Sequence, residues 1–148
     1  MWGILLLGGA VIITVWWAVR LVLVDETQRR LPDHLTLPAA LGAGTGALLT
    51  EPVLILGGLA WAGAYLLGRG IGGGDVKLAL SLGVLAAAAG GVIGVLAAVV
   101  AASAVTVVRS VLRRGKAVPH GPSMLVGTFI VVLYDTWQGA LSHLGGAS

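Results

Sequence analysis

The chain lacks cysteine and has few charged residues, and each shortage excludes a class of protein. With no cysteine, disulfide bonds, thiolate metal sites and a cysteine nucleophile are all excluded. Charged residues make up 10% of the 148 residues, compared with about 25% in soluble domains. Because so few charges cannot cover a globular surface, a water-soluble enzyme is excluded as well.

Apolar residues and glycine make up most of the remainder. Hydrophobic residues account for 57% of the sequence, and the mean hydropathy is +1.00. The 24 glycines follow no triplet period and are mixed with leucine, valine and alanine, which excludes a collagen-like or disordered chain. The composition predicts one compact, membrane-embedded domain over residues 1–148.

Apolar runs predict an all-α bundle of about six transmembrane helices. A helix needs about 20 mostly apolar residues to cross a bilayer. The runs cover residues 2–24, 35–50, 53–68, 78–90, 91–108 and 123–144. The fourth and fifth are separated at Gly90 and Gly91 because residues 78–108 are too long for one ordinary span. The pairs Gly42/Gly46 and Gly90/Gly94 have the spacing that lets helix backbones approach closely.

The basic residues predict the orientation of these helices. All nine fall at the loops after the first, third and fifth runs; they are Arg20, Arg29, Arg30, Arg69, Lys77, Arg109, Arg113, Arg114 and Lys116. By the positive-inside rule, those loops are cytoplasmic and both termini are extracytoplasmic. We therefore expect a multi-pass protein of the plasma or inner membrane, embedded in the lipid bilayer. The pI near 10.0 then reflects topology and not a nucleic-acid partner.

Two acidic residues are predicted to lie at the cytoplasmic face. Asp25 follows the first run, and Asp75 precedes the fourth. Ionisable groups near membrane depth are costly and are candidates for function. Two carboxyls that approach each other can work as an aspartic protease pair, in which one activates water and the other donates a proton. Topology alone also allows two unrelated interfacial acids.

The residues around these acids carry a family resemblance. Three segments occur in order: Asp25 with LPDHLTLP over residues 31–38, GGGDVKL over 72–78, and PHGP over 119–122. With them the chain resembles the type IV prepilin peptidase family, membrane aspartic proteases of the G-x-G-D class. The resemblance implies removal of the short basic leader from prepilins or pseudopilins of type IV pilus and protein secretion systems, at the cytoplasmic face. No cofactor and no metal are expected.

The resemblance also assigns roles to individual residues. Asp25 and Asp75 are the expected catalytic aspartates. The expected substrate-binding or supporting residues are Gly72, Gly74, Lys77, Glu26 and Asp33. Glycines permit close backbone approach, so a substrate strand can lie against residues 72–74. Lys77 is expected to give electrostatic support, whereas Glu26 and Asp33 offset the repulsion between the basic loops and a basic leader.

Asp33 has two possible roles. It precedes the second run as a helix N-cap would, and Asp or Asn commonly serves there. The alternative is that Asp33, and not Asp25, is the catalytic partner of Asp75.

Helix ends suggest how a proton is shared. Asp75 begins a helix, where the positive end of the dipole favours its ionised form, and Asp25 ends one, where the negative end disfavours it. Asp75 is then the base and Asp25 the proton carrier. Because the chain begins in a span and has no CxxC pairs, it is similar to the short, peptidase-only members, and no methyltransferase activity is expected.

Other interpretations of the sequence are weaker. The GxGxxG formed by Gly68, Gly70 and Gly73 follows no strand, so a dinucleotide site is not expected. His120 and Ser123 lack the GxSxG elbow that a serine hydrolase needs, so a serine mechanism is not expected. The three histidines lack the HExxH spacing of a zinc site. A small multi-pass transporter or a pilus-assembly scaffold without catalytic activity remains the alternative. Transporters, however, place ionisable groups near the bilayer midplane.

Overall fold

The computed structural model of the chain describes residues 2–68, 72–114 and 117–145. The described residues are 90% helical and form no strand. The elements are α1 (Trp2–Gln28), α2 (Asp33–Thr50), the short 3-10 helix η1 (Pro52–Leu54), α3 (Ile55–Leu67), α4 (Gly73–Leu112) and α5 (Gly121–Gly145). The predicted all-α fold is confirmed.

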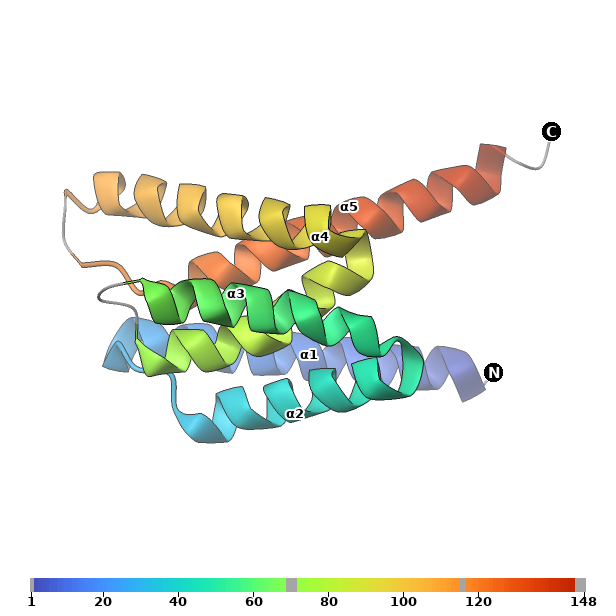
Figure 1. Cartoon of the computed structure of the whole chain (residues 1–148), viewed down its shortest axis with the longest axis horizontal. Coiled ribbons are helices and arrows are strands. Elements are labelled where there is room, and N and C mark those ends of the chain that lie inside the picture. Colours follow the sequence, from blue (N-terminus) through green and yellow to red (C-terminus); the bar gives the residue numbers. More distant parts are fainter. Residues whose placement is uncertain (1, 69–71, 115–116, 146–148) are drawn as a thin grey trace.

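The break predicted inside the long apolar run is present in α4. Gly90 and Gly91 leave helical geometry, and Gly91 takes a φ of 58°, which favours a residue without a side chain. The helix folds back at this point, so its two halves run in opposite directions (Figure 1). Each predicted apolar run therefore coincides with a helical segment.

Two described helices are long and apolar enough to cross a membrane, namely Gly73–Leu112 and Gly121–His143, and Pro52–Leu67 is apolar but shorter. That all six segments cross the bilayer stays a prediction. The beginning of α1 and the end of α5 lie at one end of the bundle (Figure 1). The α1–α2 connection and the beginnings of α4 and α5 lie at the other, which agrees with the grouping of the basic loops.

Glycines allow close helix packing, but not at the predicted Gly42/Gly46 pair. A Cβ on Gly58 of α3 would overlap the Leu80 carbonyl oxygen of α4, and a Cβ on Gly127 of α5 would lie 2.5 Å from the Ala98 oxygen. By contrast, Gly42 and Gly46 have no neighbouring atom within 4 Å of such a Cβ. The prediction for that pair was wrong.

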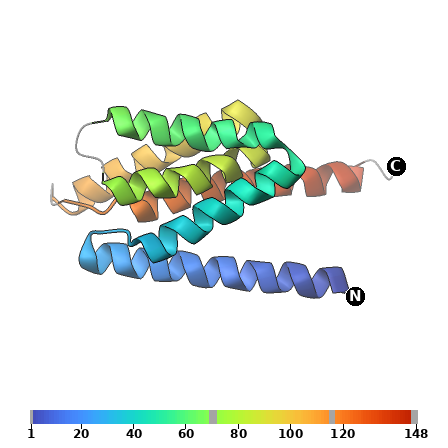
Figure 2. The ribbon, with the colours of Figure 1, turned by 60° about the horizontal axis from the view of Figure 1, so that its bottom comes forward.

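The divergence of α1 and α2 explains why these two glycines have no close neighbour. The two helices separate from their connection, as Figure 2 shows, and leave a mainly apolar groove of about 880 Å³. Gly42 and Gly46 line this groove and therefore face open space within the chain. Of the second predicted pair, Gly94 does pack closely, since a Cβ there would overlap the Ala86 carbonyl oxygen, whereas Gly90 has no such neighbour.

Candidate active site

Asp25 lies near the end of α1 that leads into α2 and is buried, with 4% of its surface exposed. Three more residues of α1 follow it, and the helix ends at Gln28 because Arg29 adopts a left-handed φ of 51°. The Asp25 carboxylate accepts a hydrogen bond of 3.1 Å from the backbone N–H of Gly121, the first residue of α5. A Cβ on Gly121 would lie 2.6 Å from the Asp25 Oδ2, so a larger residue here would displace the carboxylate.

Asp75 lies in the first turn of α4, directly after the glycine run. The close packing of Gly74 fixes this helix start. A Cβ on Gly74 would lie 2.6 Å from the Leu31 Cβ and 2.9 Å from its carbonyl oxygen. The glycine of the G-x-G-D sequence therefore lets the start of α4 pack directly on the α1–α2 connection, next to the end of α1.

The result is one cavity that contains both carboxyl groups. It has a volume of about 410 Å³ and is lined by Asp25, Arg29, Arg30, Leu31, Gly72, Gly73, Gly74 and Asp75. Fifty residues separate the two acids in sequence, and the structure places them in the same cavity, as the topology predicts. Gly72 and Gly74 also line it, whereas Glu26, Asp33 and Lys77 do not.

The two carboxyls lie outside the apolar stretches of their helices, and their surroundings disfavour charge. Burial raises the pKa of Asp75 to about 6, the charge of Asp25 contributes to this increase, and a hydrogen bond from the Gly72 backbone acts against both. Burial also raises the pKa of Asp25, while the Gly121 hydrogen bond and the positive charge of Arg109 lower it. Two such acids in one cavity titrate as a coupled pair.

Asp25 lies in the last turn of α1, as the helix-end prediction assumes. Its carboxylate, however, accepts a hydrogen bond from the N-terminal end of α5, whose positive dipole end acts against the effect predicted from α1. This contact comes from a residue 96 positions away in sequence, so the local helix position of Asp25 could not reveal it.

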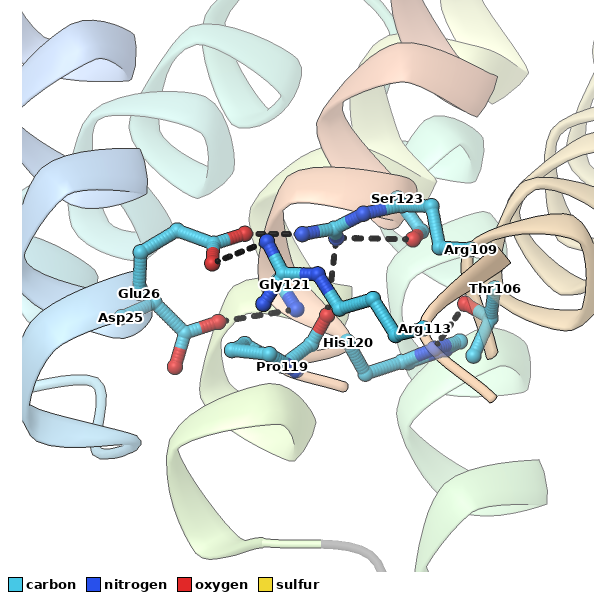
Figure 3. Close-up of polar contacts among 9 residues, drawn as sticks. All are labelled: Asp25, Glu26, Thr106, Arg109, Arg113, Pro119, His120, Gly121 and Ser123. Carbon is cyan, nitrogen blue, oxygen red and sulfur yellow. Dashed lines mark hydrogen bonds and ion pairs between the residues drawn. The ribbon is translucent and has the colours of Figure 1, made fainter. Parts of the chain in front are cut away.

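Glu26 joins three parts of the chain instead of facing the cavity. Its carboxylate forms ion pairs with Arg109 and, at 3.0 Å, with Arg113 near the end of α4 (Figure 3). Arg109 also donates to the Pro119 carbonyl oxygen at 3.0 Å. Glu26 and Arg109 thus cross-link α1, α4 and the segment before α5, and a role of Glu26 toward the substrate stays a prediction.

Asp33 and Lys77 form a pair of their own. The Lys77 ammonium lies 2.5 Å from the Asp33 carboxylate and joins the starts of α4 and α2. Asp33 is in the first turn of α2, but the N-cap is Pro32 and no side chain caps the helix. The N-cap prediction was therefore wrong. Asp33 is itself the first residue of the helix, and its carboxylate pairs with Lys77.

Two arginines that line the cavity were missed as site residues. Neither Arg29 nor Arg30 has an ion-pair partner among the residues that the structure describes. In the sequence they count only as part of a basic loop, although their position four and five residues after Asp25 was a usable signal.

His120 is a second residue that sequence reasoning left without a role. Its Nε2 lies 2.6 Å from the Tyr65 hydroxyl, and its Nδ1 lies 2.7 Å from the Thr106 hydroxyl. Both ring nitrogens are thus engaged away from Ser123, whose hydroxyl instead lies 3.5 Å from an Arg109 nitrogen. This geometry does not make a serine–histidine pair.

The remaining alternatives find little support in the structure. Within residues 2–68, 72–114 and 117–145, no three His, Cys, Asp or Glu residues are placed to hold a metal ion. Gly70, the middle glycine of the GxGxxG pattern, lies outside the described residues.

Comparison with known proteins gives one match. The sequence profile of the type IV leader peptidase family matches residues 12–107. No curated protein and no solved structure matches the chain. The matched segment contains both cavity carboxyls and ends before residues 119–122.

Proposed function

The chain belongs to the type IV leader peptidase family, as its three sequence segments predict, and on this basis we propose that it is a membrane aspartic endopeptidase that removes the short basic leader from type IV prepilins or pseudopilins. The observation that supports this proposal is the cavity shared by Asp25 and Asp75. Cleavage takes place at the cytoplasmic face of the plasma or inner membrane, where the basic loops lie.

The two carboxyls divide the chemistry of peptide hydrolysis between them. The ionised one takes a proton from water as the water oxygen attacks the scissile carbonyl carbon, and the neutral one donates its proton to the carbonyl oxygen. Breakdown of the tetrahedral intermediate returns the proton from the carbonyl oxygen, and a second proton passes to the leaving nitrogen as the C–N bond breaks. The pair begins and ends with one proton.

The surroundings of each carboxyl favour one arrangement of that proton. Asp25 accepts the Gly121 N–H and lies near Arg109, both of which stabilise its ionised form. Asp75 has the more strongly raised pKa. In the resting enzyme Asp25 is therefore the base and Asp75 carries the shared proton, the reverse of what the helix ends suggest.

The rim of the cavity gives the substrate a place to bind. Residues 72–74 line it without side chains, so an extended peptide can approach their backbone closely. Arg29 and Arg30 line the other part of the rim, and their charge is not neutralised by Glu26 or Asp33, which pair with other cations. A basic leader therefore lies away from these two arginines, toward the acids.

The test is cleavage of a prepilin from the same genome, co-expressed with the peptidase and followed by its shift in electrophoretic mobility. Asp25→Asn and Asp75→Asn are each expected to abolish the shift, because neither leaves a pair able to share a proton. Asp33→Asn is the matched control and is expected to retain cleavage, since Asp33 lies outside the cavity.

Other outcomes identify the alternatives. Loss of cleavage in Asp33→Asn together with retention in Asp25→Asn would exchange the roles of these two aspartates. A shift that survives both cavity substitutions would exclude the aspartic mechanism. Absence of cleavage of every local prepilin by the intact chain would favour the transporter or assembly scaffold.

A further inference from the structure

The first residue of α5 carries the only backbone group that hydrogen-bonds to the Asp25 carboxylate among the described residues. This donor, the Gly121 N–H, lies outside α1 and α4, so its position depends on what holds residues 119–121. Figure 3 shows that the segment is held from two directions, through the Pro119 carbonyl and through the His120 ring.

The His120 ring is fixed between two hydroxyl groups from different helices. Tyr65 of α3 lies at Nε2 with a distance of 2.6 Å, and Thr106 of α4 lies at Nδ1 with a distance of 2.7 Å. The Tyr65 and His120 rings also contact, with centroids 5.5 Å apart. Because α3 and α4 hold both edges of the ring, the residue that precedes Gly121 has one defined position.

The direction of these hydrogen bonds follows from counting protons. The Thr106 hydroxyl donates its single proton to the Ala102 carbonyl oxygen at 3.0 Å, so it accepts from His120 Nδ1–H. Burial lowers the pKa of His120 and so favours the neutral ring. With its one proton on Nδ1, the neutral ring leaves Nε2 to accept from the Tyr65 O–H.

The other side of the segment is held by charge. Arg109 donates to the Pro119 carbonyl oxygen at 3.0 Å and is itself paired with Glu26, the neighbour of Asp25 in α1. The N–H of Gly121 is thus fixed relative to Asp25 through α1 as well as through α3 and α4. Nothing in this arrangement of described residues places His120 itself in the cavity of the two acids.

We propose that His120 is a positioning residue of the peptidase, which holds the Gly121 N–H on the Asp25 carboxylate through its hydrogen bonds to Tyr65 and Thr106. The proposal rests on the proposed function, because Asp25 matters there as the base. Loss of the His120 hydrogen bonds frees the segment 119–121, and Asp25 loses a donor that favours its ionised form and fixes its orientation.

Thr106→Val and Thr106→Ser test this without removing the ring. Valine has a similar shape but cannot accept from Nδ1–H, whereas serine keeps the hydroxyl. We expect Thr106→Val to lower kcat by about tenfold to a hundredfold with little change in KM, since misplacement of a catalytic group by about 1 Å can cost this much. Thr106→Ser restores most of the rate. Thr50→Val, at the far end of α2, is the matched control.

A second readout does not depend on cleavage. Titration of the Asp25 carboxyl, followed by carbon NMR in micelles and assigned by the signal lost in Asp25→Asn, is expected to show a pKa about one unit higher in Thr106→Val. The charged and titratable groups that act on Asp25 are Glu26, Arg109 and Asp75, with Arg29 and Arg30 on the same cavity. None of these is altered by the substitution.

The outcomes separate this inference from the proposed function. Wild-type kcat and an unchanged Asp25 titration in Thr106→Val would overturn the positioning role, while prepilin cleavage by the wild type would still stand. Failure of the wild type to cleave would remove the proposed function, and the Asp25 titration would then decide the His120 contact by itself. Equal loss of rate in the valine and serine variants would also contradict the proposal.

Discussion

At the scale of single residues, the two cavity carboxyls differ in what surrounds them. Asp25 is held by a backbone donor from α5, whereas Asp75 stands in the first turn of α4 with a pKa raised to about 6. A coupled pair of this kind can catalyse peptide hydrolysis in one protonation state, in which the two carboxyls share a single proton. The pH dependence of cleavage should report that state.

We expect kcat/KM to fall as the pH rises through about 6, because Asp75 then loses the proton that it must donate. Well above this pH the decrease approaches about tenfold per pH unit, as expected for loss of a single proton. The measurement is cleavage of a prepilin by the detergent-solubilised protein over a series of pH values. Circular dichroism over the same series controls for unfolding, and an activity that rises through pH 6 and stays high in alkali would contradict the assignment.

The two acids could be predicted from sequence for a physical reason, and their neighbours could not. In a chain with so little charge, a carboxyl beside an apolar run is conspicuous, and the glycines before Asp75 identify the second one. In the sequence, Arg29 and Arg30 count only as part of the basic-loop pattern that predicts the orientation of the helices. The roles of His120 and Gly121 depend on contacts across tens of residues, which neither periodicity nor local spacing contains.

At the scale of elements, the important junction is the start of α4 against the α1–α2 connection. Gly74 contacts the Leu31 Cβ and backbone, while its neighbour Gly73 has open space where a Cβ would be. Both residues belong to the first turn of the same helix, so they differ mainly in packing. This difference provides a matched pair of substitutions.

Gly74→Ala is expected to destabilise the protein by about 1–3 kcal/mol, the usual cost of overpacking, because its methyl group would overlap Leu31. The same displacement would move Asp75 away from Asp25 and reduce prepilin cleavage. Thermal unfolding in detergent gives the stability, and Gly73→Ala serves as its control, with an unfolding midpoint near that of the wild type. If both variants unfold at the same temperature as the wild type, the contact with Leu31 does not fix the start of α4.

The helices themselves could largely be predicted, because apolar runs end where charge, proline or paired glycines interrupt them. The break at Gly90 and Gly91 is an example, since one of its residues needs a backbone conformation that suits glycine. The end of α1 could not be predicted as well from the sequence. Polar residues 25–28 continue the helix beyond the apolar run. Hydropathy therefore locates the end of the apolar run and not the end of the helix.

At the scale of the whole molecule, large apolar side chains cover much of the outside. Ile12, Leu49, Ile93 and Val111 are each at least 70% exposed. Exposed apolar surface of this extent marks contact with lipid or protein. Together with the basic loops at one end, it is consistent with a multi-pass arrangement, and the extracytoplasmic location of both termini stays a prediction.

The lack of cysteine makes this topology directly testable by labelling single introduced cysteines with a membrane-impermeant maleimide. Glu51→Cys and Ser142→Cys are expected to react in intact cells, because these exposed residues lie at the end of the bundle that is predicted to be extracytoplasmic. Arg114→Cys, in the basic loop after α4, is expected to react only after permeabilisation. The cysteine-free wild type supplies the background, and labelling of Arg114→Cys in intact cells would reverse the orientation.

The contact between Asp25 and Gly121 also has a consequence for how the protein is made. Asp25 emerges from the ribosome first, Asp75 follows fifty residues later, and the backbone donor Gly121 follows 96 residues after Asp25. A nascent chain can therefore contain both acids before either has its finished surroundings. The surroundings of Asp25 are therefore complete only once α5 packs beside α1.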